Sequence, residues 1–239
     1  MNRPLRASLI GTAATVALVV GASAPALAAS TDSTDSAKHP HTLAEIQASA
    51  KVKTDKRIAS LTSAIARVTA NKQVSDADRA AILETLNHDL SGMHDVEAKI
   101  AADTSVATAA TDYATIFTGY RVYAVALPQS HFAAAADRMT STAVPRLTDA
   151  QKKLSAALSG KYASKSTPEL QADLADMTTQ IDAASALLDG LAAKSLAVTP
   201  ADYNSNHDVL SPIRTSIKTA IADLNKARAD AKTVLAAIK

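Results

Sequence analysis

The amino-acid sequence predicts an all-α protein, and three observations lead to this fold class. Alanine, the strongest helix former, is the most frequent residue. Glycine is scarce, because beyond residue 29 it occurs only at Gly92, Gly119, Gly160 and Gly190. Apolar residues recur three and four positions apart over long segments, which is the spacing of one helix face. We therefore expect an elongated antiparallel helical bundle with coiled-coil-like packing over residues 43–239.

Residues 1–29 are typical of a cleavable signal peptide. Arg3 and Arg6 supply positive charge, residues 9–21 are apolar, and residues 25–28 (Pro-Ala-Leu-Ala) contain the small residues of an A-x-A-type site that a signal peptidase accepts. The apolar run is short for a membrane-spanning helix. We expect a secreted or cell-envelope-associated protein, with a retained N-terminal anchor as the alternative.

Residues 30–42 form a polar, low-complexity linker that we expect to be disordered, since it has almost nothing to bury. The first helix is predicted over residues 43–71, with an apolar seam at Ile58, Leu61, Ile65 and Val68. Ser75 then predicts the N-cap of a second helix. The apolar face of that helix contains Leu83, Leu86, Leu90, Met93 and Ile100.

A third helix is expected after a turn at residues 103–105, and Pro128 is predicted to end or kink it, because proline cannot donate an intrahelical hydrogen bond. A fourth helical segment follows over residues 129–158, with a second candidate kink at Pro145 and a C-cap at Gly160. The sequence leaves open whether the helices on either side of Pro128 form one kinked rod.

Two further helix starts are marked by a capping threonine followed by proline, at Thr167-Pro168 and Thr199-Pro200. The helix after Thr167 has a regular apolar stripe. This stripe contains Leu170, Leu174, Met177, Ile181, Ala184, Leu188 and Leu191. The last helix is expected to start between Pro200 and Pro212 and to run towards Ile238.

Composition limits the classes of function. The chain has no cysteine, so disulfides, thiol catalysis and thiolate metal sites are excluded. Its 25 Lys and Arg and 23 Asp and Glu become equal once Arg3 and Arg6 leave with the signal. Because positive and negative charges are balanced in the mature chain, we expect no nucleic-acid partner. We also expect no stable membrane insertion after signal cleavage, since we find no second apolar segment after the signal.

The histidines do not form a recognisable metal motif, and we predict no metal and no cofactor. Glu84 and His88 share one helix face, as do His94 and Glu97, but carboxylate-bridged metal bundles need a Glu-x-x-His motif from each of two helices. A solvated polar face is the simpler interpretation. A weak divalent site at His39 and His41 is a further alternative in the linker.

Aromatic residues are concentrated in one segment, where five of the seven lie between Tyr113 and Phe132. They predict either helix core with hydroxyls at its edge or a contact surface for a protein partner. The candidate partner-binding residues are Tyr113, Phe117, Tyr120, Arg121, Tyr123 and His131.

Three short segments resemble secreted, alanine-rich helical proteins of high-GC Gram-positive bacteria. They are residues 115–123 (TIFTGYRVY), 127–131 (LPQSH) and 199–204 (TPADYN). The resemblance implies export and an all-α fold, and it implies no function.

No catalytic sequence motif is present, so we expect a non-enzymatic exported protein that acts by protein contact or self-association in the cell envelope or the medium. A carrier or holdase for apolar peptide or lipid is the alternative. A metal-dependent enzyme centred on Glu84, His88, His94 and Glu97 is a third hypothesis.

Overall fold

A computed structural model of the chain describes residues 42–239, so the predicted signal peptide and nearly all of the predicted linker lie outside these residues. The part described is built of helices packed against one another and contains no strand, which confirms the predicted all-α class. The α-helices are α1 (Leu43–Ala70), α2 (Asp76–Ala102), α3 (Val106–Thr118), α4 (Leu127–Arg138), α5 (Val144–Ser159), α6 (Pro168–Leu188), α7 (Leu191–Leu196), α8 (Pro200–Ser205) and α9 (Ser211–Ile238). None of them is both long enough and apolar enough to cross a bilayer.

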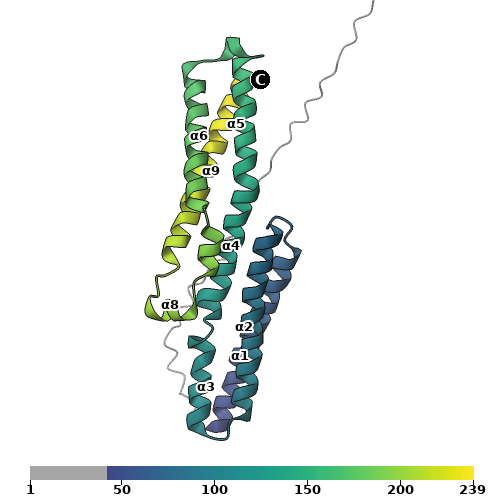
Figure 1. Ribbon diagram of the computed structural model, residues 1–239, viewed down its shortest axis with the longest axis vertical. Helices are drawn as coiled ribbons and strands as arrows, with labels where there is room; N and C mark the ends of the chain where they lie inside the picture. Colours follow the sequence, from purple (N-terminus) through teal and green to yellow (C-terminus); the bar gives the residue numbers. More distant parts are fainter. Residues whose placement is uncertain (1–41) are drawn as a thin grey trace, which may run out of the picture. The chain divides into compact units, whose positions relative to one another are not determined.

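Helices α1 and α2 form an antiparallel pair (Figure 1). The amide of Gln47, at the start of α1, donates hydrogen bonds to the carbonyls of Ile100 and Ala101, at the end of α2. The helix starts follow from local chemistry: Thr42 and Glu45 form a capping box on α1, and the Ser75 hydroxyl caps α2 as predicted. The Gln47 hydrogen bonds thus fix the register of the pair at this end.

The predicted break at Pro128 is wrong in position, because the chain turns earlier, at Gly119 to Arg121, where Arg121 adopts a left-handed backbone conformation with φ of 46°. From Val122 onwards the helical backbone runs through α4 and α5 to Ser159, past both Pro128 and Pro145.

Each of these prolines lies two residues after a π-helical turn, η1 (Val122–Ala126) or η2 (Met139–Ala143). A proline ring clashes with the carbonyl four residues before it and cannot donate to that carbonyl. The wider hydrogen-bonded ring of a π-turn displaces that carbonyl and absorbs the missing bond. The helix therefore accommodates both prolines instead of ending at them.

Helices α5, α6 and α9 pack together away from the α1–α2 pair, with α6 against α9 as the most extensive contact. A hydrophobic cluster joins the end of α5, the start of α6 and the end of α9. It contains Leu154, Leu158, Leu170, Leu174, Val234 and Ile238. Short helix α7 packs on α4, where the buried Ser195 hydroxyl donates to the Gln129 carbonyl at 2.9 Å.

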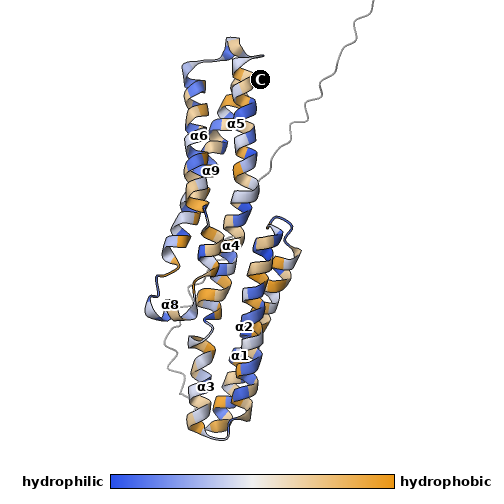
Figure 2. Cartoon of the chain, in the orientation of Figure 1, coloured by the Kyte–Doolittle hydropathy of each residue, from blue (hydrophilic) through white to orange (hydrophobic). Residues whose placement is uncertain are grey.

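Apolar residues alternate with polar ones around each long helix (Figure 2), and the buried residues largely follow the predicted stripes. The α6 stripe is confirmed from Leu170 to Leu188, but Leu191 belongs to α7, since Gly190 breaks the helix with φ of 63°. On α2 the inward face is rotated slightly, so that Ile82 is fully buried in place of Leu83.

The one glycine inside α2, Gly92, is required by close packing. It is buried, and a Cβ atom placed on it would overlap the ring of Tyr120. Glycine costs a helix interior about 1 kcal/mol relative to alanine, so this contact offsets a local penalty.

We predict that Gly92→Ala displaces the Tyr120 ring and lowers the free energy of unfolding. In a Tyr120→Ala background the same change should raise stability by about 1 kcal/mol, since only the helix propensity of alanine then remains. Urea unfolding of the four proteins measures this. Equal effects of Gly92→Ala in both backgrounds would contradict the packing role of Tyr120.

Candidate functional site

Three of the predicted aromatic residues lie near one another, and two of them contact the same cation. The rings of Tyr113 and Phe117 meet edge to face with centroids 5.4 Å apart. The guanidinium of Arg57, from α1, lies 4.7 Å from the Phe117 centroid and 5.1 Å from the Tyr123 centroid. A guanidinium between two aromatic faces is attracted to both, so α1 is joined here to α3 and η1.

Tyr123 is the outermost member of this group. Tyr123 is 47% exposed although it occupies a predicted seam position. The left-handed backbone of Arg121 changes the direction in which the following side chains point. Its hydroxyl lies 3.2 Å from the Lys56 carbonyl and donates to it. The predicted core role is therefore wrong for Tyr123, and we call Arg57, Phe117 and Tyr123 the aromatic surface.

Arg121 lies in a separate arrangement that joins the end of α3 to α8. Its Nε donates to Oδ1 of Asn204 at 2.7 Å, and its guanidinium lies 5.3 Å from the Tyr203 ring centroid. Asn204 in turn donates from Nδ2 to the Thr118 carbonyl at the end of α3, at 2.9 Å. We call these contacts of Arg121, Tyr203 and Asn204 the α3–α8 latch.

Tyr120 and His131 lie in two further places. Tyr120 packs on Gly92 of α2, and burial followed by the charges of Asp95 and Asp89 raises the pKa of its hydroxyl. His131 lines a cavity between α1 and α4. The six predicted partner-binding residues therefore do not form one continuous site, and their role in binding stays a prediction.

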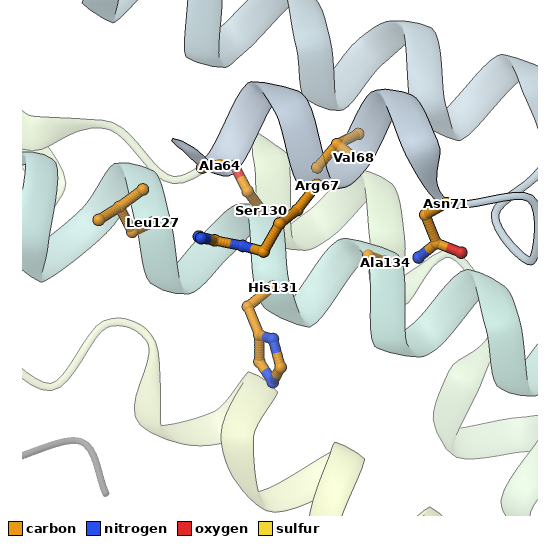
Figure 3. A pocket seen from close by; sticks show the side chains of 8 residues that line it. All are labelled: Ala64, Arg67, Val68, Asn71, Leu127, Ser130, His131 and Ala134. Atoms are coloured by element: carbon orange, nitrogen blue, oxygen red, sulfur yellow. The ribbon is translucent and has the colours of Figure 1, made fainter. Parts of the chain in front are cut away.

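The cavity beside His131 has a volume of about 230 Å³. Figure 3 shows Arg67 extending from α1 along this cavity and His131 projecting from α4. The other lining residues are Ala64, Val68, Asn71, Leu127, Ser130 and Ala134. Partial desolvation, with the positive charges of Arg138 and Arg67, lowers the pKa of His131. No residue lining the cavity is acidic.

Three carboxylates that the sequence analysis did not single out are partly or largely shielded from solvent: Asp78, Asp89 and Asp137. Asp89 on α2 is only 8% exposed, and burial raises its pKa to about 6 although nearby His88 acts in the opposite direction. Asp137 on α4 accepts a 2.7 Å hydrogen bond from the Ser75 backbone amide. Burial and the hydrogen-bonded Asp137 carboxylate raise the pKa of Asp78. For Asp89, the only sequence signal of burial was its position between the predicted apolar residues Leu86 and Leu90.

The hypothetical metal ligands are spread along α2. Glu84, His88 and His94 are exposed, while Glu97 accepts an ion pair from Lys51. Within residues 42–239, no three His, Asp or Glu side chains are grouped so that they could hold a metal ion. The geometry of this part of the chain gives the metal hypothesis no support.

Comparison of the chain with protein-family models, with curated proteins and with solved structures finds no match. The geometry of the described residues is therefore the basis for any functional proposal.

We predict that Asp89 makes stability fall as pH rises. The unfolded chain loses this proton near pH 4 and the folded chain only near 6, so the free energy of unfolding decreases between these values and stays lower above them. Asp89→Asn should remove this decrease and add about 1 to 3 kcal/mol at pH 7. Denaturant unfolding from pH 4 to 8 measures it. Exposed Asp95→Asn is the control, and an unchanged pH profile in Asp89→Asn would refute the prediction.

We also predict that Arg121 and Asn204 are energetically coupled. Arg121→Gly removes the hydrogen bond but relieves a left-handed conformation that costs a side chain about 1 kcal/mol, so its net effect is small. Asn204→Ala keeps that strain and should destabilise more. A double-mutant cycle by thermal unfolding is expected to give a coupling of about 0.5 to 1 kcal/mol, and purely additive effects would show that the latch adds no stability.

Proposed function

We propose that this protein acts by contact with another protein, in the cell envelope or the medium, and catalyses no reaction. The observation that best supports contact is the aromatic surface, where exposed Tyr123 and the cation of Arg57 lie together. Tyrosine and arginine are the residues most often found at the energetic centres of protein interfaces. The predicted signal peptide supports the location.

The surroundings of the aromatic surface suggest the chemistry of the partner. Residues 51–57 of α1 contain three lysines and Arg57 against the single carboxylate of Asp55. Lys51 is paired with Asp55 and Glu97, while Lys53 and Lys56 make no ion pair within residues 42–239. Val52 is 52% exposed, and its spacing places it on the same face of α1 as Lys56. An acidic protein with an apolar contact would match this surface.

We propose, further, that the helices form an elongated antiparallel bundle with coiled-coil-like packing. The α1–α2 pair supports this arrangement, as does the pairing of α6 with α9, where the charges of Asp173 and Asp176 reach Asp230 and contribute to raising its pKa. Such a bundle would present one continuous side of α1 to a partner.

The placement of the shielded carboxylates supports a role without catalysis. Burial raises the pKa of Asp89 to about 6, yet Asp89 does not line the cavity, where a substrate would bind, and neither do Asp78 and Asp137. If a metal enzyme were present instead, added Zn²⁺ should raise the melting temperature, since a ligand of the folded state stabilises it.

A carrier or holdase is the alternative, and the cavity is the observation that favours it. Its volume of about 230 Å³ is below the roughly 300 to 1,000 Å³ of typical ligand pockets, so a large lipid would require α1 and α4 to separate. Native mass spectrometry of the protein from its culture medium distinguishes the two, because a carrier retains a co-purified apolar ligand.

We predict that a photo-cross-linking phenylalanine at Val52 captures one discrete protein in intact producing cells. The same group at Leu235 on α9, which is 43% exposed, is the matched control and should not capture it. Tyr123→Ala should abolish the Val52 product, and rising salt should weaken it, since screening reduces contacts between exposed charges.

A second control separates loss of contact from loss of fold. Tyr162→Ala removes a different tyrosine that contacts cations, in this case Lys161 and Lys165, and should leave the Val52 product unchanged. Identical products from positions 52 and 235, or no product from either, would contradict the proposed surface.

A further inference from the structure

The cavity between α1 and α4 combines an apolar wall with unneutralised positive charge. Four lining residues are apolar: Ala64, Val68, Leu127 and Ala134. Arg67 donates a 2.6 Å hydrogen bond to the Ser63 hydroxyl and forms no ion pair with any carboxylate of residues 42–239. Arg138, near enough to His131 to lower its pKa, donates to the Gln73 side-chain oxygen. Two arginines and one histidine thus share a region without a facing acid.

Nearby carboxylates are already committed elsewhere. Asp137, adjacent to Arg138 in sequence, is buried and accepts the Ser75 amide hydrogen while it interacts with Asp78. Arg67 is exposed and donates from one guanidinium nitrogen to Ser63, which leaves its other N–H groups for a ligand. Because a guanidinium fork matches a planar carboxylate with two parallel hydrogen bonds, this charge arrangement selects an anion of that shape.

We propose that this cavity binds a small organic carboxylate whose short apolar chain lies on the alanine, valine and leucine wall. The carboxylate would pair with Arg67, and the limited volume favours a short chain over a long-chain lipid. Asn71 adds an amide donor at the cavity edge. The site goes beyond the proposed protein contact, since it uses none of Arg57, Phe117 and Tyr123.

His131 gives the site a defined response to pH. Burial and the positive charges of Arg138 and Arg67 hold its pKa down. A bound carboxylate would offset those charges, so binding should raise the pKa of His131 and become tighter as pH falls. The charged groups facing His131 are Arg67 on α1 and Arg138 on its own helical rod. By thermodynamic linkage, these two effects must occur together: if hexanoate raises the pKa of His131, protonation of His131 must tighten hexanoate binding to the same extent.

Hexanoate is the probe, and the titration of the His131 ring protons by nuclear magnetic resonance is the measurement. We expect hexanoate to raise the pKa of His131 and to bind more tightly than either 1-hexanol, which lacks the charge, or acetate, which lacks the chain. Equal binding of hexanol, or no response of His131 to millimolar hexanoate, would overturn the proposal.

Arg67→Gln tests the charge and should weaken hexanoate binding at least about tenfold, since a hydrogen bond to a charged group contributes at least a factor of ten to binding. Arg67→Lys keeps the charge but not the fork, so its loss should be smaller. Arg146→Gln removes an exposed arginine that does not line the cavity and should bind as wild type. Equal weakening in Arg67→Gln and Arg146→Gln would reduce the effect to net charge and refute the site. A failure of cross-linking at Val52 would not bear on these results.

Discussion

The α3–α8 latch is the contact that supports the turn between α3 and the helical run that follows it. Arg121 holds a left-handed conformation that ends α3 and starts the long helical run from Val122 to Ser159. That conformation is unfavourable for a side-chain-bearing residue, so it needs support from outside the turn. Asn204 supplies it, because one amide both accepts from Arg121 and donates to the Thr118 carbonyl left open by the end of α3. Asn204 thereby holds this turn although it lies 83 positions from Arg121 and 86 from Thr118 in the sequence.

The π-turns explain why two prolines fail to break the helix that this turn begins. Proline rules apply to a backbone with regular i to i−4 hydrogen bonds, and a sequence gives no direct sign that this ladder widens. At η2, the Val144 amide donates to the Met139 carbonyl, five residues back, just before Pro145. The same pattern at η1 joins the Leu127 amide to the Val122 carbonyl before Pro128. Leu158, at the far end of this continuous run, is 1% exposed, so the run delivers residues to a distant core as well as to the cavity.

Local signals were predictable from sequence, and their spatial combinations were not. Ser75, Thr167 and Thr199 cap helices as expected because capping needs only residues within three positions. The α6 stripe follows from helical periodicity alone. The aromatic segment behaves differently: its members divide among the aromatic surface, the latch, the Gly92 contact and the cavity. A single left-handed residue rotates every side chain after it, so a seam counted through Arg121 places Tyr123 inside when it lies outside.

Charge placement connects these structural features to function. Asp137 on α4 accepts a hydrogen bond from the Ser75 backbone amide and interacts with Asp78 on α2, and Asp89 is buried on α2. None of these three carboxylates lines the cavity. The cations have a different distribution: Arg57 contacts the rings of Phe117 and exposed Tyr123, Arg67 and His131 line the cavity, and Arg138 lies near enough to His131 to help lower its pKa. Recognition of a charged partner needs fixed charge at an accessible surface. The described residues meet this requirement at two places on α1, and this supports the binding roles that we propose.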